Sequence, residues 1–237
     1  MGDSTVDGIG ALSFPERAGN AADAAYVFVR EAVIQGGFAI GSRLTEWQVA
    51  DSLRMSRTPV REAMRRLVGD GILEFQPNRG TFVRSYSTRE IEELFELRVL
   101  LEPEVTAAAA TKIGTSKLDD LRQLQDQIEE RGADSDTSNI VRIGQLNREF
   151  HRIIATASDS PRLVRTLSNS IEAPVVQQTF RRYNVEQLQR SFHHHRELIA
   201  ALAAGDPNWA RDVMSCHIRA AKHVMIAKYQ QGDRKKN

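Results

Sequence analysis

From residue 87 onward, about 150 residues show helical periodicity and almost no strand signal. Apolar residues recur there at three- and four-residue steps, a spacing typical of amphipathic helices. The pattern is interrupted at short polar or glycine-containing segments, which are IGTS, GADSDTS, SDSP, RRYN and GDPN. We therefore expect one all-helical domain of six helices over residues 87–230, followed by a short tail at 231–237.

Residues 21–86 predict a smaller domain of a different kind. Three short amphipathic stretches follow one another, the second with Thr45 as its N-cap and the third with Thr58 as its N-cap and Pro59 in the first turn. The segment ILEFQPNRGTFVR comes next, and its two apolar runs flank a Pro-Asn-Arg-Gly turn that is typical of a β-hairpin. Residues 1–20 lack periodicity, so we expect a disordered arm there.

The composition limits where such a chain resides. Its one cysteine, Cys216, excludes an intrachain disulfide and favours a reducing compartment, and we expect the thiol to be buried. No run of 18 apolar residues occurs, and the N-terminal segment lacks the basic and apolar regions of a secretion signal. We expect a cytoplasmic protein that does not cross a membrane.

The basic charge of the chain is concentrated in one segment. The whole chain has a formal net charge of only +1, but residues 54–66, RMSRTPVREAMRR, hold five arginines and one acid. Arg57, Thr58 and Arg61 share the helix face opposite the apolar stripe, where an arginine fork can reach guanine in the major groove of DNA. A solvated charged helix face is the alternative that the charges alone leave open.

A longer string around this segment resembles the winged helix-turn-helix domain of GntR-family transcription regulators. The string is LTEWQVADSLRMSRTPVREAMRRLVGDGILEFQPNRGTFV, with the match most specific in SRTPVREAMRRL, DGIL and PNRGTFV. The resemblance implies binding of double-stranded DNA, with the wing tip entering the minor groove. The residues it implies in these contacts are Ser56, Arg57, Thr58, Arg61, Arg79 and Gly80.

Three positions depart from the pattern of that family. Trp47 stands where many members carry a basic residue, which removes a phosphate contact. Arg54 and Met55 replace the usual Gly-Val between the two helices, so we expect Arg54 to adopt a strained backbone conformation. These departures affect the operator and the affinity rather than the class of protein.

Three consecutive histidines occur in the segment SFHHHRELIAAL, residues 191–202. Successive side chains on a helix are about 100° apart, so the three cannot share one face. His195 continues the apolar stripe of this helix, His193 falls on the polar face, and His194 lies at the margin. Only His195 is therefore expected to point inward.

Polar side chains also interrupt two other apolar stripes. Asn147 and His151 are four residues apart on one apolar face, and His217 lies on a stripe that excludes His223. Each inward histidine alone is consistent with a hydrogen-bonded core residue. Together, three inward histidines with Asn147 suit a divalent transition metal with open coordination positions. Periodicity leaves both interpretations open.

The patterns ELRVLLEPEVTAAAA, LNREFHRII and HRELIAALAAGD with MSCHI resemble the FCD effector domain of the FadR subfamily. The resemblance covers residues 87–230 and implies a helical bundle whose metal-binding members use one aspartate and three histidines around an effector pocket. His151, His195 and His217 match the histidine positions, and Asn147 stands at the aspartate position. We expect a divalent transition metal (Zn, Ni or Mn), held less tightly because an amide oxygen is a poorer ligand than a carboxylate.

Arg98 lies on an apolar stripe as well, and a buried guanidinium needs an anion. One candidate is Glu102, four residues later on the same helix face. The other is the carboxylate of a small organic acid bound beside the metal as an effector. We therefore assign Arg98 to the effector site while both partners stay open.

The sequence as a whole predicts a mostly α protein that acts as a ligand-responsive transcription regulator. We expect a repressor that binds a pseudo-palindromic operator as a homodimer. One alternative is a metal-free sensor whose histidines bind an acidic effector directly. A metal-dependent hydrolytic enzyme is disfavoured because no inward acid is expected near the histidines as a general base, so we expect no enzyme.

Overall fold

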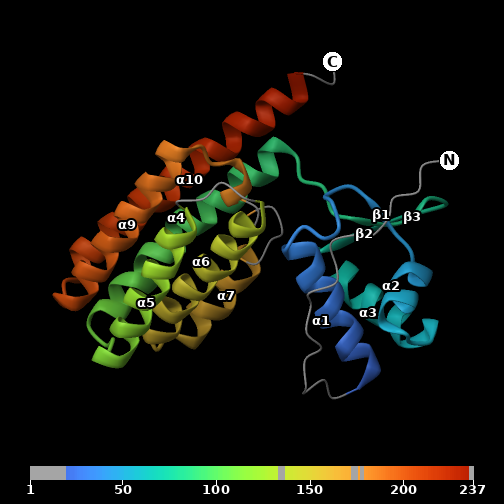
Figure 1. Ribbon diagram of the computed structural model, residues 1–237, viewed down its shortest axis with the longest axis horizontal. Coiled ribbons are helices and arrows are strands. Elements are labelled where there is room, and N and C mark those ends of the chain that lie inside the picture. The colour runs from blue at the N-terminus through green and yellow to red at the C-terminus, as the bar shows by residue number, and fades with distance from the viewer. Residues whose placement is uncertain (1–19, 133–136, 172–175, 177–178, 235–237) are drawn as a thin grey trace. The chain divides into compact units, whose positions relative to one another are not determined.

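The structure is a computed structural model that describes residues 20–132, 137–171, 176 and 179–234. The chain divides into two compact units between Ser85 and Tyr86 (Figure 1). The predicted disordered arm, except for Asn20, lies outside the described residues, as does the end of the predicted tail at residues 235–237. Each unit is described by itself below.

The first unit combines three helices with a small sheet. Its elements are α1 (Ala21–Ile34), β1 (Arg43–Leu44), α2 (Glu46–Leu53), α3 (Arg57–Gly69), β2 (Leu73–Gln76) and β3 (Gly80–Val83). The strands are antiparallel in the order β1-β3-β2. The predicted helices and hairpin are confirmed, and β1 is an additional strand of two residues, too short to show an alternating pattern.

The core of this unit lies where α1 packs on α3. Val29 and Val33 of α1 and Val60 and Leu67 of α3 have no exposed surface. Burying such side chains contributes about 1.5–3 kcal/mol each. Because the apolar stripe of α3 faces inward, the opposite face of this helix is presented to solvent.

The ends of α2 and α3 show which residues begin and end these helices. Thr45 caps α2 as predicted, since its hydroxyl accepts from Gln48 N at 3.2 Å and the Gln48 side chain accepts from Thr45 N at 2.9 Å. Arg54 has φ 50°, in the left-handed region, as expected where glycine is usual. The prediction of Thr58 as the N-cap of α3 is wrong, because the extended residue before the helix is Ser56 and α3 begins at Arg57.

The second unit is all helical among the described residues, which confirms the predicted fold class. Its elements are α4 (Thr88–Ala110), α5 (Thr115–Gly132), α6 (Thr137–Ala157), α7 (Pro161–Ile171), the 3-10 helix η1 (Thr179–Arg182), α9 (Val185–Ala203) and α10 (Pro207–Arg234). Figure 1 shows α4 and α10 side by side, and α5 packs on both α6 and α9. Five of the breaks between the described helices fall at the predicted segments, but α7 ends at Ile171, well before the predicted break at RRYN. The helix α10 continues into the predicted tail.

Cys216 is exposed, so the expectation of a buried thiol is wrong. The helical period of α10 explains the error. Val213, Met214 and His217 are buried and form the inward face, and Cys216 lies on the outward side with Asp212. The position of Cys216 on the helix therefore predicts its exposure better than the general preference of cysteine for the protein interior.

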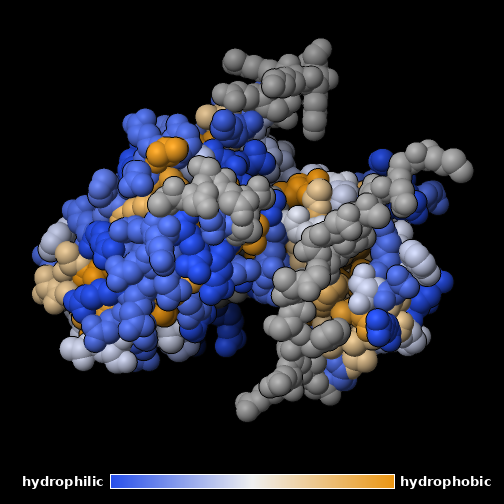
Figure 2. All heavy atoms as spheres, viewed as in Figure 1, coloured by the Kyte–Doolittle hydropathy of each residue, from blue (hydrophilic) through white to orange (hydrophobic). Residues whose placement is uncertain are grey.

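None of the described helices is long and apolar enough to span a membrane. The visible face of the helical unit carries mostly hydrophilic residues with scattered apolar ones (Figure 2). That surface is typical of a helical bundle with its apolar side chains turned toward its own core.

Candidate metal site and nucleic-acid surface

Three buried histidines from three helices converge inside the helical unit. His151 lies on α6, His195 on α9 and His217 on α10, and none is more than 5% exposed. Each ring offers one nitrogen, and these three atoms lie within 4.8 Å of one another. The structure therefore brings together the three histidines that the periodicity placed inward.

A side chain of α5 orients the ring of His195. The Nδ1 atom of His195 lies 2.7 Å from Oε1 of the buried Gln125. Gln125 donates through Nε2 to Glu129 at 2.8 Å, so its Oε1 is the acceptor for His195. Nδ1 thus carries the proton, and Nε2 turns its lone pair toward the other histidines. Burial lowers the pKa of His195 well below its ordinary value, which keeps the ring neutral.

A buried carboxylate orients His151 in the same way. Glu102 on α4 places Oε2 3.0 Å from His151 Nδ1 and accepts through Oε1 from Arg98 Nε at 2.6 Å. Burial alone would raise the pKa of Glu102, but the charge of Arg98 and the contact with His151 outweigh it and lower that pKa to about 2. The carboxylate is ionised, so His151 donates from Nδ1 and its Nε2 is free to accept.

Glu102 corrects the expectation that no inward acid stands near the histidines. The sequence pattern indicated Glu102 only as a candidate partner for Arg98, and the structure confirms that pairing. It contacts the Nδ1 side of His151, away from the shared space, and both of its oxygens are occupied. Such an arrangement holds a ring in place, whereas a general base needs a free oxygen facing the reacting group.

Asn147 and each of the three inward histidines have a buried side-chain atom without a hydrogen-bond partner among the described residues. These atoms are Asn147 Oδ1, His151 Nε2, His195 Nε2 and His217 Nδ1. Burial and the neighbouring His195 lower the pKa of His217 well below its ordinary value, so this ring is neutral too. Unpartnered buried polar atoms are rare because each costs free energy. Three imidazole nitrogens and one amide oxygen suit a divalent transition metal, whose bonds to nitrogen are about 2.0–2.1 Å long.

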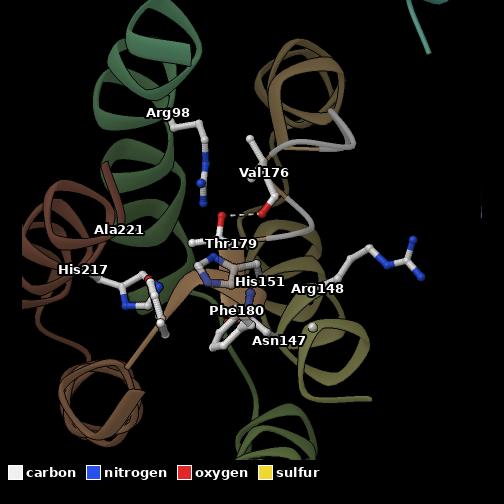
Figure 3. A pocket seen from close by; sticks show the side chains of 11 residues that line it. Arg98, Asn147, Arg148, His151, Val176, Thr179, Phe180, His217 and Ala221 are labelled. Atoms are coloured by element: carbon white, nitrogen blue, oxygen red, sulfur yellow. Dashed lines mark hydrogen bonds between the residues drawn. The ribbon is translucent and has the colours of Figure 1, made fainter. Parts of the chain in front are cut away.

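A cavity of about 30 Å³ adjoins these atoms, with Arg98, Asn147, His151 and His217 in its lining (Figure 3). Such a volume holds one or two water molecules. In Figure 3 Arg98 points toward the same space as His151, whereas Arg148 extends away from it. Only the Nε atom of Arg98 has a hydrogen-bond partner among the described residues, so its two Nη groups can bind an anion there.

The histidine triplet divides as the helical period predicts. His193 is exposed, His194 is half-buried and His195 is fully buried. His194 contacts His217 edge to face with ring centroids 5.8 Å apart. Burial also lowers the pKa of His194, which fits its place at the margin of the site.

Gln125 is the residue of this site that sequence reasoning missed. It lies on the inward stripe of α5 between Leu121 and Ile128, which have no exposed surface. A polar residue on an apolar stripe is the same signal that identified Asn147 and His217. Applied to α5, that signal would have identified Gln125 as well.

The first unit presents the predicted DNA-contacting residues on its surface. Arg57, Thr58 and Arg61 are exposed on α3, opposite its buried stripe. Ser56 makes no capping hydrogen bond with its side chain. Hydroxyl and guanidinium groups on one exposed helix face match the donors that contact phosphates and guanine edges.

The β2–β3 hairpin ends in the turn that the sequence predicted. Asn78 has φ 61° and Gly80 has φ 102°, and Arg79 between them is exposed. A Cβ atom on Gly80 would lie 3.2 Å from Arg43 Nε, so both the backbone angle and the space favour glycine there. The tip therefore presents an arginine on a narrow backbone turn.

A winged helix-turn-helix unit joined in one chain to a helical unit with a buried polar site is the architecture of a transcription regulator. The chain belongs to the gntR family of bacterial regulatory proteins: residues 21–83 match the model of that family, and residues 93–220 match the FCD domain. The predicted membership is confirmed, and the FadR-like subfamily fits. The named relatives are transcriptional regulators rather than enzymes.

Relatives and solved structures agree with this assignment. The HTH-type transcriptional regulator YdhC of Bacillus subtilis is 30% identical over 62% of this chain and 63% of its own length. McbR of Escherichia coli is 27% identical over 84% of this chain and 88% of its own. Its solved structure covers 89% of this chain and 99% of its own with a TM-score of 0.78 at 24% identity, and so shows the fold. A GntR structure from a Rhodococcus species covers 87% and 97% with a TM-score of 0.72 at 25% identity.

Proposed function

We propose that the protein is a ligand-responsive transcription regulator that binds an operator in duplex DNA as a homodimer. The observation that carries DNA binding is the exposed donor face of α3 beside a hairpin with an arginine at its tip. One recognition helix contacts too few base pairs for selectivity in a genome, and a two-fold dimer on a pseudo-palindromic site doubles the contacts. Repression is the simplest outcome of such binding.

Each residue on this surface has a proposed role. Arg57 and Arg61 bind base edges in the major groove, while the hydroxyls of Ser56 and Thr58 donate to phosphates. Arg79 enters the minor groove, and Gly80 lets the wing backbone approach the duplex. These roles follow from exposure and donor chemistry.

We propose that Asn147, His151, His195 and His217 hold a divalent transition metal, with Zn, Ni and Mn as candidates. The unpartnered buried atoms of these four residues carry this proposal. When bound, the ion supplies open coordination positions for an acidic ligand. Glu102 and Gln125 fix the tautomers of two of the rings, which is the support that metal-bound histidines usually have.

Arg98 is proposed to bind the carboxylate of a small organic acid beside this site. It lies in the cavity wall, and its hydrogen bond with Glu102 uses Nε, which leaves the two Nη groups to bind an anion. A cavity of about 30 Å³ is too small for such an acid, so binding has to displace part of the wall. Displacement of packed helices is how a bound effector can favour one arrangement of a dimer over another.

Replacing Asn147 with aspartate is expected to raise the affinity for Zn²⁺ about tenfold or more. The substitution keeps the position of Oδ1 and adds a negative charge, and ligand charge is a main determinant of cation affinity. Competition with a chromophoric chelator measures the change.

Asn208→Asp provides the matched control for this prediction. Asn208 is exposed near the start of α10 and lies outside the cavity lining, so the affinity for Zn²⁺ should stay at the wild-type value. Equal affinities for wild type and Asn147→Asp would show that Oδ1 is not a ligand. Absence of any tight metal binding by the wild type would favour the metal-free sensor.

A further inference from the structure

A carboxylate lies between two of the arginines proposed to contact DNA. Glu46, the first residue of α2, accepts from Arg61 Nε at 2.7 Å and from Arg61 Nη2 at 2.9 Å. The same carboxylate accepts from Arg57 Nη2 at 3.3 Å. An acid here places a negative charge on the surface that approaches the phosphates of DNA.

The contribution of these ion pairs to the stability of the fold does not explain why an acid stands at position 46. The side chains of Arg61 and Arg57 are 53% and 62% exposed, and exposed pairs of this kind contribute little to folding. Glu46 is more enclosed, with 25% of its side chain exposed, and it stands on a helix start fixed by the capping box of Thr45. The carboxylate therefore stands on a fixed helix start and binds two largely exposed arginine side chains.

The geometry of the Glu46–Arg61 pair leaves the other edge of the guanidinium available. Glu46 occupies the side formed by Nε and Nη2. A guanidinium has five N–H groups in a rigid plane, so the end formed by Nη1 and the outer hydrogen of Nη2 still presents two donors. Those two donors match O6 and N7 of guanine.

We infer that Glu46 is a specificity-determining residue, which holds Arg61 with its outer edge toward a guanine and weakens binding of the surface to DNA of arbitrary sequence. The inference rests on the proposed DNA-binding function. Holding a long side chain in one orientation lowers the entropy cost of the base contact. The carboxylate of Glu46 also offsets part of the positive charge of the arginines. It therefore weakens their attraction to DNA of any sequence, because that attraction depends on the number of phosphates neutralised.

The test compares the wild type with E46Q and E46D in selection from a randomised duplex library, followed by binding to the selected duplex and a scrambled one. Both variants are expected to lower the ratio of the two affinities by about 5- to 100-fold, the worth of one bidentate base contact. E46Q should also bind the scrambled duplex more tightly, because it removes a negative charge, whereas E46D keeps that charge but shortens the reach.

The control variant is E62Q. Glu62 is exposed on α3 next to Arg61 in sequence and makes no hydrogen bond with Arg57 or Arg61, so its loss changes the charge without changing the support. Its affinity ratio should stay within about twofold of the wild type. Unchanged ratios and unchanged base preferences in E46Q and E46D would overturn the inference. A wild type that enriches no sequence would instead show that the proposed DNA-binding function fails, and the inference falls with it.

Discussion

Replacing His195 with alanine is expected to lower the metal affinity of the protein by more than about a hundredfold. The change removes one of four ligands, and even loss of a partner that only orients a ligand costs about 10- to 100-fold. Elemental analysis of protein purified without chelator or nickel resin should find about one metal ion per wild-type chain and little in the variant. Added metal should raise the thermal stability of the wild type by about 2.7 kcal/mol at one hundred times its Kd, and that of the variant by less than about 0.4 kcal/mol at the same concentration.

His193→Ala is the matched control for this result. It removes the same side chain two positions away, but His193 is exposed on the outer face of α9, so metal content and metal-dependent stability should equal those of the wild type. Circular dichroism establishes that the helical content is kept, and His217→Gln provides a second variant of similar volume. Equal metal content in wild type, His193→Ala and His195→Ala would refute the proposed site.

Replacing both Arg57 and Arg61 with alanine is expected to lower the affinity for the selected operator by about a hundredfold or more. Each bidentate contact with a base contributes about 1–3 kcal/mol of discrimination. The affinity for a scrambled duplex should change far less, so the double variant approaches non-specific binding. Fluorescence anisotropy with both duplexes at one fixed salt concentration measures the two affinities.

The control for the Arg57 and Arg61 variants removes two positive charges from the helical unit instead. Arg89 and Arg122 lie on α4 and α5, with side chains 88% and 47% exposed, and their double replacement should leave the selectivity for the operator intact. If Arg57→Ala with Arg61→Ala kept the wild-type footprint and base preference, α3 would not be the recognition helix.

Helical periodicity was sufficient to predict the inward residues of this protein because the rule is local. It separated His195 from His193 and His194, and it placed His151 and His217 on inward faces. Capping chemistry likewise identified Thr45, whose partners lie within one turn. Capping chemistry did not identify the N-cap of α3. Ser56 and Thr58 are both residue types that favour this position, and the backbone conformation alone decides between them.

Contacts between distant helices could not be predicted in this way. The hydrogen bond from His195 to Gln125 spans 70 residues, and that from His151 to Glu102 spans 49. Periodicity shows that such a side chain points inward but not which helix it faces. The pair of Glu46 with Arg61 also joins two helices, so the support of the recognition helix emerged only from the structure.

The measurement that tests the account most directly is the operator affinity with and without a small carboxylate. Thermal shift first identifies which acids of a panel bind the metal-loaded protein, and anisotropy then measures DNA affinity at saturation. We predict a change of about fivefold or more for an acid that binds, as expected of a coupling energy above about 1 kcal/mol, and no change in Arg98→Ala. Binding of the acid with unaltered operator affinity would contradict the proposal that the helical unit senses an effector for the DNA-binding unit.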